Sequence, residues 1–371
     1  MRLTLTVKNA SAALNAVAGA VGSGTTIPIL GCVKLVAKDD ALALTTSDLD
    51  AQASTRAPAK VTRPGGVCAP FRALADIVRH LDKDADMSLA VEDDKPSLRV
   101  VSGRSRFTLP TLPVEDFPDF GDLGETVELM FDAKALAQTL ECVAVAVSTE
   151  ETRYYLNGIY LHAHEDGLRA VATDGHRLIR RDLPSQELST KTFAAVILPT
   201  AAVKDMRRLA AEAAKDETAW LASDGKRVAF TLSQARLVSK VIDGTFPDYT
   251  RVIPEHGAIR AEVETAALSR AVTRALIACG KNARSGALDF ADARLTLSAH
   301  DADGISASDE IDAALDGAPI RIGFNLRYLA ELIPALAGER LALRMTDPQG
   351  PAVLFDPADA TTLGVLMPLR V

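Results

Sequence analysis

The chain has 371 residues, of which 48% are hydrophobic, 24% charged and 5% aromatic, and its formal net charge is −8. This length exceeds what a single hydrophobic core usually serves, so it predicts two or three domains. The apolar content excludes a wholly disordered chain. The acidic balance argues against a nonspecific coat on nucleic acid, because such a coat gains its affinity from positive charge.

The N-terminus reads as an alternating strand followed by an alanine-rich helix, not as a secretory signal peptide. No apolar run approaches the roughly 18 residues that a membrane span needs, so no membrane partner is expected. Cys32, Cys68, Cys142 and Cys279 lie far apart, which favours small buried side chains in a reducing compartment over a disulfide or metal framework. We therefore expect a cytoplasmic protein.

Six stretches carry apolar residues at three- and four-residue spacing, which predicts amphipathic helices. In chain order these windows are 7–22, 70–83, 131–147, 198–213, 263–284 and 324–338. The segments between them alternate apolar and polar residues, as short antiparallel strands do. Runs of strands with few helices indicate an α+β fold rather than regular alternation of strand and helix.

The chain also repeats itself. An acid that follows Ser, Thr or His recurs at Asp48, Asp174 and Asp301, in steps of about 127 residues, and the helix windows recur in step. Solenoid repeats have periods of roughly 20–50 residues, so this longer period indicates repeated domains. Three such domains fill the chain, and the short polar junctions 121–127 and 254–260 are the expected boundaries.

Three local patterns could carry catalysis or bind an ion, but each has a plainer interpretation. Asp174 and His176 could form an acid/base pair, although Asp-Gly is a common tight turn and no nucleophile signature accompanies it. His162 and His164 could be metal ligands, but without a third ligand an exposed strand is favoured. The segment 22–26 resembles a phosphate-binding loop without its Lys-Ser/Thr, so a helix-ending turn is favoured. We expect no enzyme, metal or cofactor.

The charge is unevenly distributed along the chain. The six helix windows carry +5 and the remaining residues −13. Ordinary solvated faces would explain one basic helix, but this separation across three repeats suggests two surfaces with different partners. A moderately basic, helix-lined surface can hold phosphates without reading base edges. The main carriers are Arg72, Arg79, Lys83, Lys204, Arg207, Arg208, Arg270, Arg274, Lys281 and Arg284.

An ordered set of motifs identifies a family. The motifs are Ile27–Gly31, Thr46–Asp50, Ser102–Phe107, Leu112-Pro113 before Asp116–Pro118, Arg153–Gly158, Ala172–Leu178, Asp243-Gly244 before Phe246–Tyr249, Gly323–Asn325 and Met367–Val371. Each is weak alone, but together they span essentially the whole chain. In this set the sequence resembles the bacterial DNA polymerase III beta subunit, the replicative sliding clamp.

The resemblance implies three similar domains, expected at 1–123, 124–255 and 256–371, each with antiparallel sheets outside and two helices inside. Two chains would join head to tail into a ring around duplex DNA. The chain would be a non-catalytic processivity factor that tethers the polymerase, with a nucleotidyltransferase classification only through its holoenzyme. Because enclosure replaces tight binding, its DNA contacts can stay weak and sequence-blind.

The implied partners are double-stranded DNA, the polymerase III alpha subunit, the clamp loader, other polymerases and repair proteins with clamp-binding motifs, and a second copy of the chain. Partner peptides would enter a pocket between the second and third domains, where apolar side chains form a cleft and polar ones orient the peptide backbone. By motif, the pocket residues are Leu156, Thr173, Gly175, His176, Arg177, Leu178, Pro247, Arg251, Val252, Asn325, Tyr328, Val365, Met367, Pro368, Leu369 and Arg370. A plain terminal strand packed on its own core is the alternative for 367–369.

The resemblance also implies DNA contacts and a ring joint. The implied DNA contacts are Arg72, Arg79, Tyr154, Tyr155 and Arg207. The chain departs from its relatives at Gly24 and Thr200-Ala201, where they place basic residues, so no DNA contact is assigned there. No pocket residue is assigned in 281–286.

At the ring joint, Phe107 of one chain would pack on Leu276 and Ile277 of the next, with a place in the domain core as the alternative. Two rival functions compete with the clamp. One is an enzyme that uses Asp174 and His176, and the other is a monomeric peptide-binding scaffold that never closes a ring.

Overall fold

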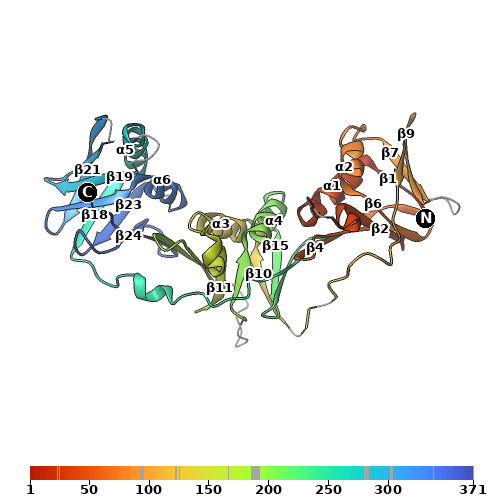
Figure 1. Ribbon diagram of the computed structural model, residues 1–371, viewed down its shortest axis with the longest axis horizontal. Coiled ribbons are helices and arrows are strands. Elements are labelled where there is room, and N and C mark those ends of the chain that lie inside the picture. The colour runs from red at the N-terminus through yellow and green to blue at the C-terminus, as the bar shows by residue number, and fades with distance from the viewer. Residues whose placement is uncertain are drawn as a thin grey trace. The chain divides into compact units, whose positions relative to one another are not determined.

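The computed structural model describes residues 1–22, 24, 26–91, 96–121, 123–124, 126–165, 167–184, 193–279, 284–300, 304–336 and 338–370. The chain, whose helices and strands are labelled in Figure 1, divides into two compact units. The first unit consists of Met1–Lys134 and Ala201–Val241, and the second of Ala135–Thr200 and Ile242–Val371. The expected central domain therefore contributes strands and helices to both units.

All six predicted helices form, each shorter than its sequence window. They are α1 (Val7–Val17), α2 (Phe71–Arg79), α3 (Ala133–Ala144), α4 (Thr200–Ala211), α5 (Thr265–Ala278) and α6 (Leu326–Ala335). Two of them begin at a side-chain cap, since Thr6 accepts the Asn9 N–H (3.2 Å) and Asn325 accepts the Arg327 N–H (3.0 Å). Such caps satisfy backbone donors that have no partner within the helix.

The first unit holds two antiparallel sheets, in the strand orders β5-β1-β7-β8-β9 and β10-β15-β16-β17-β4-β3-β2-β6. The strands are β1 (Arg2–Thr6), β2 (Cys32–Lys38), β3 (Ala41–Ser47), β4 (Ala51–Pro58), β5 (Lys60–Arg63), β6 (Gly65–Pro70), β7 (Asp86–Val91), β8 (Ser97–Ser102), β9 (Ser105–Pro110), β10 (Val127–Asp132), β15 (Thr218–Ser223), β16 (Arg227–Leu232) and β17 (Ala235–Lys240). The pairing of β17 with β4 joins segments almost 200 residues apart, with Leu237 opposite Ala53.

The second unit holds one twelve-stranded antiparallel sheet, ordered β14-β11-β12-β13-β25-β24-β23-β18-β21-β20-β19-β22. Its strands are β11 (Gly158–His164), β12 (Gly167–Thr173), β13 (Arg177–Pro184), β14 (Val196–Pro199), β18 (Ile259–Glu264), β19 (Ser285–Ala291), β20 (Arg294–His300), β21 (Ser306–Asp316), β22 (Ile320–Asn325), β23 (Arg340–Met345), β24 (Ala352–Phe355) and β25 (Thr362–Leu366). Here β25, almost the last segment of the chain, pairs with β13.

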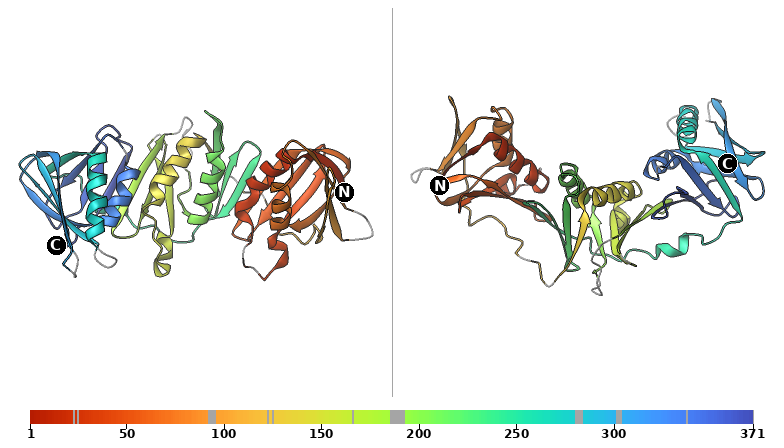
Figure 2. Two further views of the ribbon diagram at one scale, coloured as in Figure 1. Left: turned by 90° about the horizontal axis from the view of Figure 1, so that it is seen from above. Right: turned by 180° about the vertical axis from the view of Figure 1, so that it is seen from behind.

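Within each unit, helices cover one face of the sheets (Figure 2). In the first unit α1 packs on α2 and β4, and in the second α5 packs on α6, β20 and β21. Strand burial alternates as the sequence predicted, with β2 and β3 turning every second side chain inward. All four cysteines are buried, which confirms their expected role as small core residues.

The repeated acids close tight turns between strands. One carboxylate oxygen of Asp48 and one of Asp174 each accept the N–H groups two and three residues further on, at 2.6–3.0 Å. Asp224 does the same at 2.9 and 2.6 Å, so a further copy of this turn exists that the sequence comparison missed. Asp301 lies outside the described residues. The repeat therefore marks a turn that the side chain of an aspartate stabilises.

Candidate functional site

A buried apolar cluster in the second unit underlies the predicted peptide pocket. Leu156, Leu178 and Val365 belong to it, together with Phe246 and Tyr249. Leu178 lies opposite Val365 where β13 pairs with β25, so segments far apart in the sequence meet here. We call these five residues the apolar floor. Because they are buried, they support the pocket from beneath rather than form its accessible wall.

Arg177, His176 and Tyr328 form a stack beside the apolar floor. The His176 and Tyr328 rings lie 6.1 Å apart at 21°, and the Arg177 guanidinium lies 4.4 Å from the Tyr328 ring centroid. Arg177 is only 8% exposed and forms ion pairs with Asp174, at 3.1 Å, and with Glu331. Burial raises the pKa of Tyr328. A buried cation held by two carboxylates and an aromatic face is a fixed scaffold, which positions the exposed His176.

The turn that precedes β13 uses the groups that could have formed a catalytic pair. The Asp174 carboxylate accepts the backbone N–H of His176 and of Arg177. Thr173 donates its hydroxyl to the Arg177 carbonyl, at 2.7 Å, and accepts the Gly175 N–H. Gly175 has φ +89, a left-handed backbone conformation that residues other than glycine rarely adopt. The tight-turn interpretation of this motif is confirmed.

The segment after β25 is held by its backbone and offers its side chains to solvent. The Met367 N–H donates to the His176 carbonyl at 2.9 Å, and the Leu369 N–H donates to the Gly323 carbonyl at 2.8 Å. Met367 is 38% exposed and Leu369 is 41% exposed. Large apolar side chains held in this way are not packed in a core, which argues against a plain terminal strand over these residues.

A cavity of about 590 Å³ adjoins this segment. Pro368, Leu369 and Arg370, all predicted pocket residues, line part of it. The remaining lining residues are Arg321, Gly323, Pro348 and Gln349, which sequence reasoning missed. Pro348 and Gln349 follow β23 in a loop without a distinctive motif, so only the fold could bring them here.

The other predicted pocket residues have varied environments. Pro247, Arg251 and Val252 are exposed on the segment around the short helical turn Tyr249–Val252. The side-chain oxygen of Asn325 is engaged in capping α6, so this residue positions Tyr328 on the first turn of that helix.

His162 lies beneath the pocket and not on an exposed strand. It is half-buried, its Nε2 lies 2.9 Å from the Tyr249 hydroxyl, and burial lowers its pKa. His164 is also half-buried and pairs with Glu165 at 3.5 Å, so the prediction of an exposed strand is wrong for both. For His162 the cause is Tyr249, whose hydroxyl and ring lie against the imidazole. Within the described ranges no group of three His, Cys, Asp or Glu residues could hold a metal ion.

The residues predicted to contact DNA lie on the surfaces of α2 and α4 and in the short 3₁₀ helix Glu151–Leu156. Arg72 and Arg79 are exposed on α2, where Arg79 pairs with Asp76 at 3.0 Å. Arg207 is half-exposed on α4. In the second unit, Tyr154 is exposed and packs edge-on against the half-buried Tyr155, with 5.8 Å between ring centroids.

Two of the basic residues that carry the positive charge of the helices form contacts within the protein. Arg208 pairs with Asp205 at 3.5 Å and donates to the Asn15 and Ala16 carbonyls at the end of α1. A cation there favours the helix terminus. A Cβ atom at Gly19 would collide with the Asp205 carboxylate, so this contact requires glycine.

The second such carrier, Arg274 on α5, forms an ion pair with Asp309 on β21. Arg208 and Arg274 are thus both engaged by groups of the protein itself, as Arg79 is by Asp76. Another predicted carrier, Lys281, lies outside the described residues.

The residues predicted at a ring joint are accessible. Phe107 is exposed on β9, the last strand of the five-stranded sheet. Ile277 on α5 is 76% exposed, and Leu276 beside it is half-buried. The alternative, a place in the domain core, does not describe Phe107 or Ile277.

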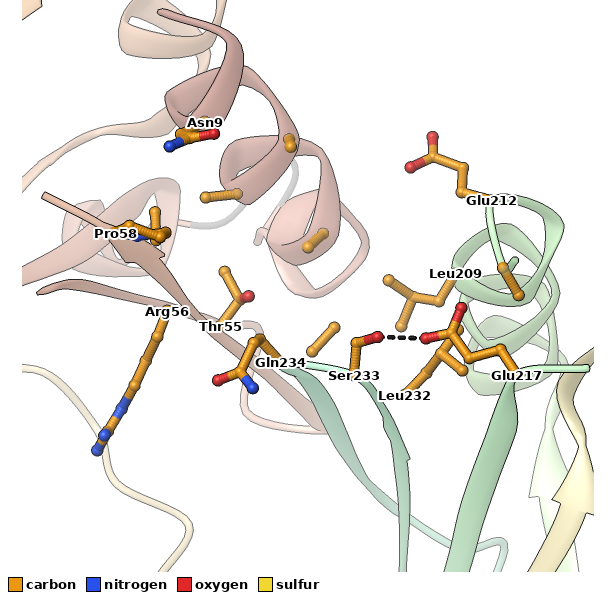
Figure 3. A pocket seen from close by; sticks show the side chains of 16 residues that line it. Asn9, Thr55, Arg56, Pro58, Leu209, Glu212, Glu217, Leu232, Ser233 and Gln234 are labelled. Carbon is orange, nitrogen blue, oxygen red and sulfur yellow. Dashed lines mark hydrogen bonds between the residues drawn. The ribbon is translucent and has the colours of Figure 1, made fainter. Parts of the chain in front are cut away.

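A cavity of about 280 Å³ in the first unit lies between α1, β4, the end of α4 and the turn joining β16 to β17 (Figure 3). Glu212 and Glu217 line it, and the Arg56 side chain points away from it. Ser233 and the Ala214 N–H donate to Glu217, and these hydrogen bonds lower the pKa of that carboxyl. Acidic lining of this kind repels phosphate, so the cavity is not a DNA-backbone site.

The fold and these surfaces define a three-domain α+β clamp. Family models of the N-terminal, central and C-terminal domains of the DNA polymerase III beta subunit match residues 1–121, 130–248 and 250–370. The chain is 39% identical to the beta sliding clamp of Caulobacter vibrioides strain NA1000 and 31% identical to that of Escherichia coli K12, with both chains covered completely in each comparison.

Solved structures agree with these relatives. The DNA polymerase sliding clamp of Caulobacter crescentus matches with a TM-score of 0.93 at 38% identity, and the sliding clamp of Pseudomonas aeruginosa bound to griselimycin matches with a TM-score of 0.95 at 30% identity. Each comparison covers 100% of both chains. The chain belongs to the DNA polymerase III beta-subunit family.

Family membership establishes the class of function. The chain is a non-catalytic clamp subunit, a processivity factor in DNA replication, and DNA and the polymerase are partners of the family. The expected α+β clamp fold and non-catalytic role are thereby confirmed. Among the described residues, no helix combines the length and the apolar character that crossing a membrane would require.

Proposed function

We propose that the chain pairs head to tail with a second copy to enclose duplex DNA in the cytoplasm, and that it receives partner peptides beside His176, Tyr328 and the segment 367–370. The peptides would come from the polymerase III alpha subunit, the clamp loader, and other polymerases and repair proteins with clamp-binding motifs. The pocket would comprise the sixteen residues named from the motifs. The proposed domain limits remain 1–123, 124–255 and 256–371.

The terminal segment carries the peptide-binding proposal. Met367 and Leu369 stay exposed while their backbone N–H groups are fixed to His176 and Gly323. An apolar side chain that is held in place yet open to solvent loses little entropy when a partner covers it. The adjoining cavity of about 590 Å³ has room for side chains of a peptide.

The test compares two leucines of nearly equal exposure, Leu369 at 41% and Leu49 at 40%. Peptide affinity is measured by fluorescence anisotropy with a labelled peptide carrying a Gln followed by spaced apolar residues. Leu369→Ala is expected to weaken binding about tenfold, because roughly 1–2 kcal/mol of apolar contact is lost. Leu49→Ala is the matched control and should leave the affinity unchanged. Equal affinities for all three proteins would refute the pocket.

Sequence-independent enclosure of DNA is supported by exposed arginines on α2 together with Arg207 and the tyrosine pair at 154–155. A ring is expected to stay on closed circular DNA after treatment with the clamp loader and to leave when the circle is cut. Release at the same rate from circular and linear DNA would contradict enclosure. Retention that depends on base sequence would contradict contacts made through phosphates.

The ring joint is supported by the exposed Phe107 on an edge strand and by the exposed Ile277. The two sites differ in kind, since Phe107 lies on the edge strand β9 and Ile277 lies on the helix α5. A contact between two unlike surfaces is heterologous, which is the head-to-tail arrangement. Ile277→Asp is expected to convert the dimer to a 39.3 kDa monomer in analytical ultracentrifugation. A monomeric unmodified chain at micromolar concentration would instead support the scaffold alternative.

A further inference from the structure

A separate cavity in the second unit is lined by three arginines. Its volume is about 410 Å³, and Arg169, Arg180 and Arg344 contribute its cationic groups. Glu255 and Asp359 contribute its acidic groups. Two of these arginines come from neighbouring strands, β12 and β13, and the third from β23. None of the three belongs to the proposed peptide pocket.

The first arginine already has a counterion. Arg169 donates from Nε and Nη2 to the two carboxylate oxygens of Asp182, at 2.5 and 2.8 Å. This bidentate ion pair neutralises both charges. Arg169 therefore contributes little unmatched charge to the cavity.

The other two arginines lack comparable partners. Arg180 reaches Asp182 only at 4.0 Å, and that carboxylate is already engaged by Arg169. Arg344 donates from Nη2 to the Pro254 carbonyl at 3.0 Å. The Nε atoms of Arg180 and Arg344 are buried and have no hydrogen-bond partner among the residues that the structure describes. Burial and the adjacent Arg169 charge lower the pKa of Arg180. Both arginines are half-buried, and a donor that is removed from water without a partner is costly, so an anion that adds charge complementarity at these guanidinium groups is favoured.

The acidic lining does not supply that anion. Asp359 accepts the N–H and the hydroxyl of Thr361, at 2.8 and 2.5 Å, so its carboxylate is already engaged. Glu255 is exposed, and solvent screens its charge. With the Arg169–Asp182 pair set aside and the charge of Glu255 screened by solvent, the two positive charges of Arg180 and Arg344 face the single negative charge of Asp359, which leaves an excess of one positive charge. A carboxylate, which carries one negative charge, matches this excess better than a doubly charged phosphate.

Apart from Thr250 and Thr362, the remaining wall of the cavity is mainly apolar. Tyr249, Ile253, Phe355 and Leu363 line it, and the Arg344 guanidinium lies 5.9 Å from the Phe355 ring centroid. A ligand that fills this space therefore needs an apolar body beside its charged group. A free inorganic anion would leave most of the wall uncovered.

We propose that this cavity binds the carboxylate of an acidic residue that is flanked by an apolar residue in a peptide segment of a partner protein. The planar guanidinium groups of Arg180 and Arg344 suit a carboxylate with two acceptor oxygens. The apolar neighbour lies against Tyr249 and Phe355. This site is independent of the segment 367–370, so a partner can use either one alone.

The test uses two matched probes, acetyl-Leu-Glu-amide and acetyl-Leu-Gln-amide, titrated against the full chain in ligand-observed saturation-transfer NMR. The Glu probe is expected to bind at least tenfold more tightly than the Gln probe. Arg180→Gln and Arg344→Gln should each weaken binding of the Glu probe about tenfold. Arg344→Lys retains the charge without the planar fork and should give an intermediate loss. The control is Arg294→Gln, on an exposed arginine of β20, which should bind as the unmodified chain does.

Several outcomes would overturn the proposal. Equal binding of the two probes would show that the carboxylate is not recognised. Full binding by both glutamine variants, each folded by circular dichroism, would place the probe elsewhere. Displacement of the Glu probe by an equal concentration of inorganic phosphate would assign the site to phosphate instead. Loss of the probe on removal of residues 367–371 would place it in the peptide pocket, whereas retention there supports a separate site.

Discussion

Two turns of nearly identical sequence behave differently in this molecule. Thr173–Arg177 precedes β13, and Ser223–Arg227 precedes β16. In each, the aspartate accepts two backbone N–H groups and pairs with the arginine that ends the motif, at 3.1 Å. Arg177 then meets Tyr328 and Glu331, whereas Arg227 donates to the Phe120 carbonyl at 2.6 Å. The comparison teaches that the motif specifies a turn, and that distant segments decide whether the turn serves a site.

The largest expected difference between the turns concerns their arginines. Arg177→Ala leaves Asp174 nearly buried without its cation, and breaking such a pair typically costs about 3–5 kcal/mol of unfolding free energy. Arg227 is more exposed, so Arg227→Ala is expected to cost only about 1–2 kcal/mol. Urea unfolding at a fixed protein concentration measures both. Only Arg177→Ala should also weaken peptide binding, and equal effects on both properties would contradict the comparison.

An intermediate effect is expected from pH. Burial alone would raise the pKa of Asp224, but the N–H groups of Lys226 and Arg227 and the Arg227 side chain outweigh it and lower that pKa. A lowered pKa in the folded state stabilises the protein above the usual pKa of aspartate, about 3.9, and this contribution is lost as pH falls through the folded-state value. Asp224→Asn should therefore be less stable at pH 7 and should lose less stability between pH 5 and 3. Parallel pH profiles of melting temperature would show that Asp224 does not make this contribution.

The smallest effect concerns the glycines of the two turns. Gly175 and Gly225 have φ of +89 and +82, where a Cβ atom costs roughly 1–2 kcal/mol. Gly175→Ala and Gly225→Ala should therefore lower stability about equally in thermal unfolding. A Cβ atom at Gly175 would also lie 2.7 Å from Nη1 of Arg153, so only this variant should disturb the short 3₁₀ helix Glu151–Leu156, which contains Arg153 and Tyr154. A large stability difference between the variants would mean that the two turns are not equivalent in backbone strain.

Much of the fold could be predicted because it follows from local patterns. Periodic apolar residues predicted six helices and the alternating segments predicted antiparallel strands, since both patterns report which side faces the core. The turn at Asp224 was missed because it lies about 50 residues after Asp174, within a repeat and not one repeat further on. The pairing of β17 with β4 leaves no local trace in either strand.

The site was harder to predict than the fold. The motifs identified Leu178 and Val365 as pocket residues, but the structure buries both beneath it, because a motif does not distinguish support from contact. The charge count included Arg208 and Arg274 but could not show that they bind carbonyl and carboxylate groups that only the folded chain brings near. Arg180 was missed for a different reason. Its Nε lacks a hydrogen-bond partner only in the folded chain, and nothing in the sequence indicates this.

The pairing of β4 with β17 also governs how the chain can be divided. A fragment that stops at residue 123 keeps β4 but loses the strand that covers it, which leaves a row of unpaired backbone N–H and carbonyl groups at an open sheet edge. Such an edge recruits other strands, so the fragment would self-associate although its helices and core are intact. The eight-stranded sheet is thus shared by residues from both sides of the limit at 123. A truncation at that limit divides the sheet.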